Sequence, residues 1–326
     1  MYATIEQIAD WIRTHDNVAV ITHGRPDGDA YGCALGMVRI FRALGKRAFP
    51  VDDDRVEPRY GFLEGSDEFT NEINGLPFEP ECAFGVDCSD AERMKNSRAL
   101  FERFEDRAAI DHHDSDDGLF APLVYVEPEA SACGEIVLKL VRLLNVEMDR
   151  PLAECIYTAI ATDSGNFSFR STSAFSLRAA ADCVEAGADP EKLTRILFRE
   201  RSLAKTRLLG YGLSSMVLSP GGRVAGMCLP DAAFEACRAE REDSHNLVNY
   251  MNEIDGVYVG ILCEERPNGV RISFRGAHDT DVAALAAKFG GGGHTAAAGA
   301  TVDGCSLEEK FREVMREAAK YVGEAE

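Results

Sequence analysis

The chain has 326 residues, of which 45% are hydrophobic, and this is enough for packed cores in two domains. Its formal net charge of −20 argues against a long duplex nucleic acid as partner, because such binding depends on neutralising many phosphates. No apolar segment approaches the roughly 20 residues that cross a membrane, and ten cysteines without a Cys-x-x-Cys pair argue against structural zinc and disulfide scaffolds. We therefore expect a cytoplasmic protein with no membrane partner.

The first part of the chain alternates strand and helix patterns. A β-branched run at 18–22 predicts a buried strand, and apolar residues spaced by three and four predict a helix over 30–44. Further strands are predicted at 47–51, 82–86 and 108–110. This alternation indicates an α/β fold with a mostly parallel sheet that carries helices on both faces.

The pattern of predicted elements changes after the Ser-Pro-Gly-Gly turn at 219–222. The remaining predicted elements are helices over 152–161, 174–186, 199–213, 281–289 and 306–321, a helix that begins near Asp189, and strands over 224–229, 257–263 and 270–274. We expect a larger domain over 1–187, a helical linker over 188–213 and a smaller α/β domain over 214–326.

Residues of the types that bind metals follow three of the predicted strands directly. They are His23, Asp27, Asp29, Asp87, Asp111, His112 and His113, with Asp163 farther along the chain after a predicted helix. In open α/β sheets, ligands bind outside the carboxyl ends of the strands. We therefore expect these segments to converge on one crevice.

Each of these residues, taken alone, has a simpler structural explanation. Capping of the following helix is the better interpretation of Asp27 or Asp29 singly, and Asp163 could cap the turn at Gly165. Several carboxylates in one crevice would repel each other strongly unless cations neutralised them. Carboxylate and imidazole donors together suit manganese or another divalent ion, so the whole set predicts a metal centre.

A glycine run followed by His294 predicts a phosphate contact in the smaller domain. The run lacks the Lys-Ser/Thr ending of a Walker loop, which argues against an NTPase. It is either a flexible link or an anion nest formed by the N–H groups of Gly291, Gly292 and Gly293, with His294 as a further donor. Arg275, which ends a predicted strand, is either a surface arginine or a phosphate ligand.

The order of these motifs resembles the DHH phosphoesterase family. His-x-x-x-Asp-x-Asp, an isolated Asp, Asp-His-His and Thr-Asp-x-Gly follow one another across residues 23–166. The segment Gly-Gly-Gly-His-x-x-Ala-Ala-Gly at 291–299 resembles the associated substrate-binding domain. The resemblance covers nearly the whole chain and is strongest to members that degrade very short RNA and dephosphorylate 3′-phosphoadenosine 5′-phosphate (pAp). It favours substrate contact by Arg275 and His294.

The resemblance implies two manganese ions, with magnesium or another divalent ion as the alternative. Six side chains would hold the ions: His23 and Asp27 for one ion, Asp29, His112 and Asp163 for the other, and Asp87 as a bridge between them. Two further residues would act beside the ions. Asp111 would orient the histidines, as metal-bound imidazoles generally require, and His113 would point to the scissile phosphate.

The leading hypothesis is a two-metal phosphodiesterase or phosphatase, similar to an oligoribonuclease, whose partners are short RNA or small phosphorylated nucleotides. One alternative is a phosphodiesterase for linear dinucleotides of the pApA type, formed in cyclic-dinucleotide turnover. Another is an inorganic pyrophosphatase or exopolyphosphatase, which the glycine-histidine segment matches less well. A non-catalytic nucleotide sensor would lack a metal ligand, and none is missing. The sequence is compatible with a homodimer.

Overall fold

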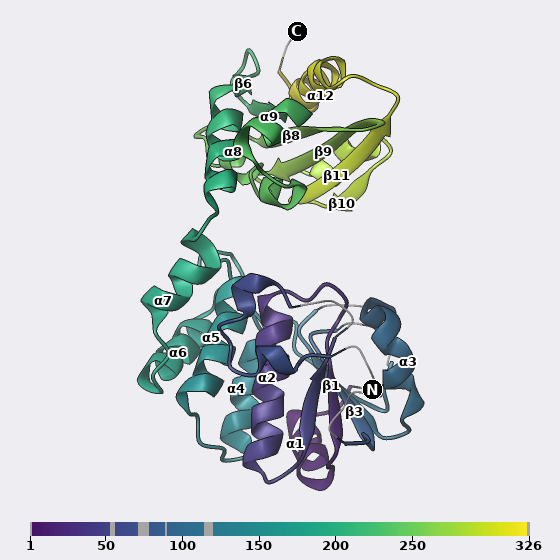
Figure 1. Ribbon diagram of the computed structural model, residues 1–326, viewed down its shortest axis with the longest axis vertical. Helices are drawn as coiled ribbons and strands as arrows, with labels where there is room; N and C mark the ends of the chain where they lie inside the picture. Colours follow the sequence, from purple (N-terminus) through teal and green to yellow (C-terminus); the bar gives the residue numbers. More distant parts are fainter. Residues whose placement is uncertain (1, 53–55, 71–77, 89, 114–119, 325–326) are drawn as a thin grey trace. The chain divides into compact units, whose positions relative to one another are not determined.

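A computed structural model describes residues 2–52, 56–70, 78–88, 90–113 and 120–324, and the chain divides into two compact units, residues 1–200 and 201–326. Each unit contains one β-sheet packed against helices, as the alternation of strand and helix patterns predicts (Figure 1). Within the described residues, no helix combines the length and the apolar character needed to cross a membrane.

The sheet of the first unit is entirely parallel, with the strand order β2-β1-β3-β4-β5. Its strands are β1 (Val18–Ile21), β2 (Ala48–Val51), β3 (Cys82–Val86), β4 (Arg107–Asp111) and β5 (Leu123–Val126). Every residue of β1 and β3 is buried, which explains why these strands are uninterrupted apolar runs in the sequence. The predicted strands match β1 to β4, whereas the edge strand β5 was not predicted.

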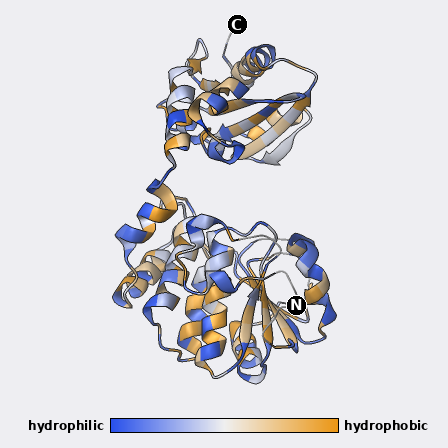
Figure 2. Cartoon of the chain, in the orientation of Figure 1, coloured by the Kyte–Doolittle hydropathy of each residue, from blue (hydrophilic) through white to orange (hydrophobic). Residues whose placement is uncertain are grey.

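Helices cover both faces of this parallel sheet. The helices of this unit are α1 (Ile5–Thr14), α2 (Gly28–Ala43), α3 (Arg98–Arg103), α4 (Cys133–Leu143), α5 (Arg150–Asp163), α6 (Ala174–Glu185) and α7 (Pro190–Thr194), with short 3-10 helices at Pro58–Tyr60, Ser66–Glu68 and Glu92–Ser97. Val18 and Val20 pack with α1, α2, α4 and α5 on one face, while Ala19 and Ile21 pack with α3 on the other. The apolar strands therefore lie between more polar helix surfaces (Figure 2).

Helices α2 and α5 approach each other closely because glycines on α2 present no side chain. Gly28, Gly32 and Gly36 follow one another at four-residue spacing, so they share one face of the helix. A Cβ atom on Gly32 would lie 2.4 Å from the Cys155 carbonyl oxygen, and one on Gly28 would lie 2.4 Å from Thr162. This contact brings the beginning of α2 against the end of α5.

The second unit has a mixed sheet with the strand order β10-β11-β9-β8-β7-β6, in which only β7 and β8 pair in parallel. The strands are β6 (Val217–Leu218), β7 (Val224–Leu229), β8 (Val259–Arg266), β9 (Gly269–Gly276), β10 (Gly292–His294) and β11 (Ala297–Asp303). The helices are α8 (Leu203–Ser214), α9 (Asp231–Cys237), α10 (Asn249–Asn252), α11 (Val282–Ala287) and α12 (Leu307–Tyr321), with a 3-10 helix at Arg241–Ser244. One apolar cluster joins the sheet to α11 and α12, and another joins it to α8, α9 and α10.

The segment expected as a helical linker contains several short elements. After α7, a single π-helical turn spans Arg195–Arg199, and α8 starts at Leu203 rather than at residue 199. The Ser202 hydroxyl accepts a hydrogen bond from the Lys205 N–H at 2.9 Å and caps α8. This cap fixes the beginning of the helix, which the apolar spacing alone could not do.

Candidate metal centre

Three adjacent parallel strands deliver the candidate ligands to one edge of the first sheet. His23 lies just beyond β1, Asp87 follows β3 directly, and Asp111 is the last residue of β4. The strands are neighbours in the order β1-β3-β4, so their carboxyl ends lie side by side. The structure thus brings together the motifs that the sequence places after separate strands, at the position where open α/β sheets bind ligands.

Asp27 caps α2 with one carboxylate oxygen, and its other oxygen makes no hydrogen bond to the residues that the structure describes. Its Oδ1 accepts hydrogen bonds from the N–H groups of Asp29 and Ala30, at 3.0 and 3.2 Å. The capping interpretation is therefore correct for Asp27, but it uses only one of the two oxygens. Capping and metal binding are compatible at this residue.

Asp29 caps a different helix from the one that carries it. Its fully buried carboxylate accepts hydrogen bonds from the N–H groups of Cys133 and Gly134, at 2.6 and 3.0 Å. Both donors lie in the first turn of α4, whose own N-cap residue, Ala132, has no side chain suited to the task. Asp29 therefore joins α2 to α4 and aims the amino end of α4 at the centre.

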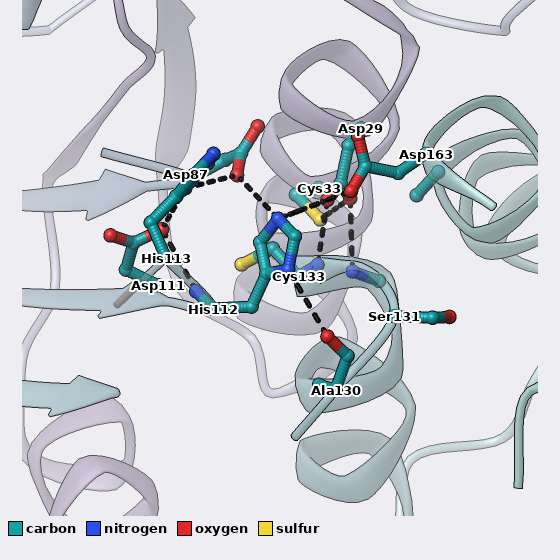
Figure 3. A network of polar contacts seen from close by, with 12 residues as sticks. Asp29, Cys33, Asp87, Asp111, His112, His113, Ala130, Ser131, Cys133 and Asp163 are labelled. Atoms are coloured by element: carbon teal, nitrogen blue, oxygen red, sulfur yellow. Dashed lines mark hydrogen bonds and ion pairs between the residues drawn. The ribbon is translucent and has the colours of Figure 1, made fainter. Parts of the chain in front are cut away.

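Two histidines turn one ring nitrogen toward the carboxylates. The Nδ1 atoms of His112 and His23 lie 3.2 and 3.1 Å from the carbonyl oxygens of Ala130 and Gly24. A carbonyl oxygen only accepts, so each Nδ1 carries the proton and each Nε2 has an available lone pair. His112 Nε2 lies 3.3 Å from Asp163 and 3.6 Å from both Asp29 and Asp87 (Figure 3).

The donor atoms form two groups of three, and Asp87 faces both. The groups are His23, Asp27 and Asp87, and Asp29, His112 and Asp163; within each, the donor atoms lie within 4.8 Å of one another. Oδ2 of Asp87 lies 3.6 Å from His23 Nε2, and its Oδ1 lies 3.6 Å from His112 Nε2. Asp87 has a left-handed φ of 54°, a conformation that Asp and Asn tolerate better than most residues.

A third grouping combines Asp87 and His112 with His113. However, His113 Nδ1 lies 2.8 Å from Asp111 Oδ1, and this hydrogen bond raises the pKa of His113 despite its partial burial. The same Asp111 oxygen accepts a hydrogen bond from the His112 N–H at 2.8 Å. Asp111 is completely buried, so it holds the two histidines from behind and leaves His113 Nε2 for another contact.

The electrostatics of the cluster fit bound cations. Burial, with the nearby Asp87 charge, raises the pKa of Asp29 well above its usual range, and burial raises the pKa of Asp163 to about 6. The pKa of Asp87 is lowered in spite of burial, because His23, His112 and His113 surround it. In the described part of the chain, His112 Nε2 and Asp87 Oδ1 are buried and make no hydrogen bond. Buried acceptors of this kind are suited to metal ions.

The candidate phosphate residues lie in the second unit. A hollow of about 510 Å³ is lined by Arg275, Gly291, Gly292 and Gly293, among others, whereas His294 is exposed at the end of β10 and does not line this hollow. Gly292–His294 forms the edge strand β10, paired with β11, so this run is not a loop. Arg275 donates hydrogen bonds to the side chain of Asn249 and to the Phe274 carbonyl oxygen, both at 3.0 Å, and burial lowers its pKa.

Sequence reasoning missed the backbone groups of the centre. The carbonyl of Ala130 and the N–H groups of Cys133 and Gly134 hold His112 and Asp29 in place. Backbone atoms occur at every residue and carry no sequence signal. The helix that presents the two N–H groups, α4, was not predicted, although the apolar spacing over residues 133–143 was an available clue to it.

Comparison with known proteins gives the family of the chain. The chain is 34% identical over 300 residues to the bifunctional oligoribonuclease and PAP phosphatase NrnA of Thermus thermophilus, a match that covers 91% of this chain and 88% of the relative. The chain belongs to the DHH family. The DHH family N-terminal domain matches residues 17–160 of this DHH protein, and the DHHA1 domain matches residues 232–324.

Solved structures share the fold of this DHH protein. An exopolyphosphatase-related protein from Bacteroides fragilis superposes with a TM-score of 0.86 at 23% identity, covering 98% of this chain and 97% of the other. The exonuclease RecJ bound to manganese superposes with a TM-score of 0.53 at 14% identity, covering 100% and 96%. At these identities the likeness extends to the fold and not to a particular substrate.

Proposed function

We propose that the chain is a two-metal phosphoesterase that hydrolyses very short oligoribonucleotides, pAp, or both. The observation that carries the proposal is the pair of donor groups in which Asp87 faces both His23 and His112. The oligoribonuclease and PAP phosphatase activities named for the Thermus relative support the same chemistry. A cytoplasmic location is supported by ten free cysteine thiols.

We infer that His23 and Asp27 hold one ion, that Asp29, His112 and Asp163 hold the second, and that Asp87 contacts both. Two imidazoles among six donors favour manganese over magnesium, and a RecJ structure with this fold contains manganese. When bound, such a pair of cations activates water and stabilises negative charge on phosphoryl oxygens.

His113 supplies a hydrogen bond to the substrate in this proposal. Its Nδ1 is held by Asp111, so Nε2 is free to donate to a phosphoryl oxygen when the ring is protonated. Asp111 keeps the imidazole oriented and raises its pKa, which maintains the charged form at higher pH. The His113 side chain is 38% exposed, which leaves it accessible to a ligand.

We further propose that residues 1–187 form the catalytic domain, 188–213 a linker and 214–326 the substrate-binding domain. The hollow beside Arg275 and the glycine strand would receive a phosphate or nucleoside group, with His294 as a further donor. An edge strand has one row of backbone groups without a strand partner, and glycine lets a ligand approach them closely. This replaces the expected anion nest in a loop with binding along a strand edge.

The test compares pAp, pApA, a five-residue RNA, pyrophosphate and long single-stranded DNA, each with manganese and with magnesium. The proposal expects turnover of the short nucleotides and little turnover of long DNA or pyrophosphate. Preferential cleavage of pApA would favour a linear-dinucleotide phosphodiesterase. Rapid pyrophosphate hydrolysis would contradict the proposal, and binding without turnover would indicate a sensor.

Asp87→Asn provides a matched variant for the metal assignment. Asparagine keeps the size of the side chain and tolerates the left-handed backbone, so the fold should persist while one ligand oxygen is lost. Activity should fall by at least about 100-fold, because the shared carboxylate contacts both ions. Asp10→Asn, on the exposed surface of α1, is the control and should retain full activity.

A further inference from the structure

Phe169 is an exposed aromatic residue in the segment that follows Asp163. Its relative exposure is 58%, although burying such a ring is normally favourable. The backbone beneath it is firmly held. The Ser164 carbonyl oxygen accepts hydrogen bonds from the N–H groups of Ser168 and Phe169, at 3.0 and 2.9 Å. The backbone that carries the exposed ring is therefore held in place.

Three consecutive residues in the left-handed region shape this segment. Gly165, Asn166 and Phe167 have φ angles of 58°, 55° and 62°, and an aromatic residue rarely adopts this conformation. Hydrogen bonds stabilise the arrangement: the Asn166 N–H donates to the Ala161 carbonyl oxygen at 2.7 Å, and the Phe167 N–H donates to the Ser164 hydroxyl at 3.0 Å. Such strain persists where the surrounding structure enforces it, often beside functional sites.

The segment folds the Phe169 ring onto Gly165. A Cβ atom on Gly165 would lie 2.4 to 2.6 Å from three atoms of the ring, so the ring lies directly against this glycine. One side of the ring thus rests on a backbone position two residues after Asp163. The rest of the ring is exposed, in the turn that directly follows this candidate metal ligand.

We propose that Phe169 is a stacking platform for the base of the nucleotide whose phosphate is hydrolysed. The inference rests on the proposed function and adds a specificity-determining residue to it. A base is joined through one sugar to the phosphate at the metal centre, so a ring held in the turn that follows Asp163 is suited to meet it. Stacking accepts every base, because each has an aromatic face. A single fixed ring suits a short substrate better than a long strand, which needs a row of such rings.

Removing the ring should weaken the binding of substrates that contain a base. Base–aromatic stacking corresponds to a loss of about 5- to 150-fold when the aromatic side chain is truncated. We expect Phe169→Ala to raise the KM for pAp within this range. The KM for 1-O-methylribose 3,5-bisphosphate, which has the same phosphates and no base, should not change. Phe169→Trp should restore the KM for pAp.

Binding supplies a second readout that does not need turnover. The chain has one tryptophan, Trp11, which is buried in the first unit, so Phe169→Trp adds an exposed fluorophore. Adenosine 5′-monophosphate should quench the added fluorescence by stacking, whereas ribose 5-phosphate should not. Both variants should unfold near the temperature of the parent protein, because the replaced side chain is mainly exposed.

The outcomes separate this inference from the proposed function. If Phe169→Ala lost equal efficiency on substrates with and without a base, or lost none on either, the stacking assignment would be wrong. If the unmodified protein hydrolysed none of the nucleotides, the proposed function would fail, and the quenching titration would then decide the stacking assignment. Equal quenching by the two phosphates, or none, would overturn it.

Discussion

The close contact between α2 and α5 should set the geometry of the metal centre, and Gly32→Ala tests this. The new Cβ would lie 2.4 Å from the Cys155 carbonyl oxygen, where ordinary contacts begin at 3.4 Å, so the two helices must separate by roughly 1 Å. The obstacle is backbone and cannot rotate away as a side chain could. Asp29 lies on α2 and Asp163 ends α5, so their carboxylates should move apart.

Two opposing contributions determine how much Gly32→Ala changes the free energy of unfolding. Overpacking of a tight core costs about 1–3 kcal/mol, and a backbone obstacle favours the upper part of that range. Replacing a helical glycine with alanine stabilises the helix by about 1 kcal/mol, because alanine has the higher helix propensity. The free energy of unfolding should therefore fall by about 1–2 kcal/mol. Manganese affinity should fall by about 10- to 100-fold, because donor distances must be kept within about 0.2 Å.

Urea unfolding followed by tryptophan fluorescence measures the stability, since the only tryptophan, Trp11, reports on the first unit. Calorimetric titration with manganese measures the affinity. Gly36→Ala is the control on the same face of α2: its Cβ would meet a Val137 methyl group at 3.3 Å, and a side chain can yield. Equal stability and equal manganese affinity in both variants would refute the argument that the helix contact sets the ligand spacing.

Three further predictions address protonation, orientation and substrate contact. The pKa of Asp163 is about 6 in the folded protein without metal, against 3.8 ordinarily. Protonation of Asp163 at low pH therefore stabilises the metal-free fold, and this stabilisation is lost as the pH rises through 6. Manganese should accordingly raise the Tm much less at pH 5 than at pH 7.5, and equal increases would contradict this. Asp111→Asn should lower kcat about 10- to 100-fold with little change in manganese affinity, because Asp111 holds His113; a matching loss of metal binding would show that it holds an ion itself. Arg275→Ala should raise the KM for pAp about tenfold or more, with exposed Arg312→Ala as the control, and an unchanged KM would remove Arg275 from the substrate site.

Uninterrupted burial made the central strands predictable from sequence. The strands β1 and β3 are apolar at every position because helices cover both faces of the sheet. The edge strands β5 and β10 were missed for the opposite reason. Only one residue of β5 is buried, and β10 consists of two glycines and a histidine, so neither carries an apolar pattern.

The convergence of the metal-type residues was predictable because it depends on topology. Residues that follow adjacent parallel strands must meet at one edge, whatever the details of their side chains. The roles of individual side chains were less accessible. Capping of its own helix was the simpler explanation of Asp29 taken alone, whereas its hydrogen-bond partners lie 104 and 105 residues away on α4, a pairing that only the three-dimensional fold reveals.

The unequal structural duties of the ligands bear on how such a protein could lose its activity during evolution. Asp29 holds two backbone N–H groups of α4 in the buried interior, so a mutation there would damage folding together with any chemistry. Asp163 ends α5, caps no helix in the described chain and is only partly buried. A descendant that kept nucleotide binding and abandoned hydrolysis would therefore be expected to change at position 163 before position 29.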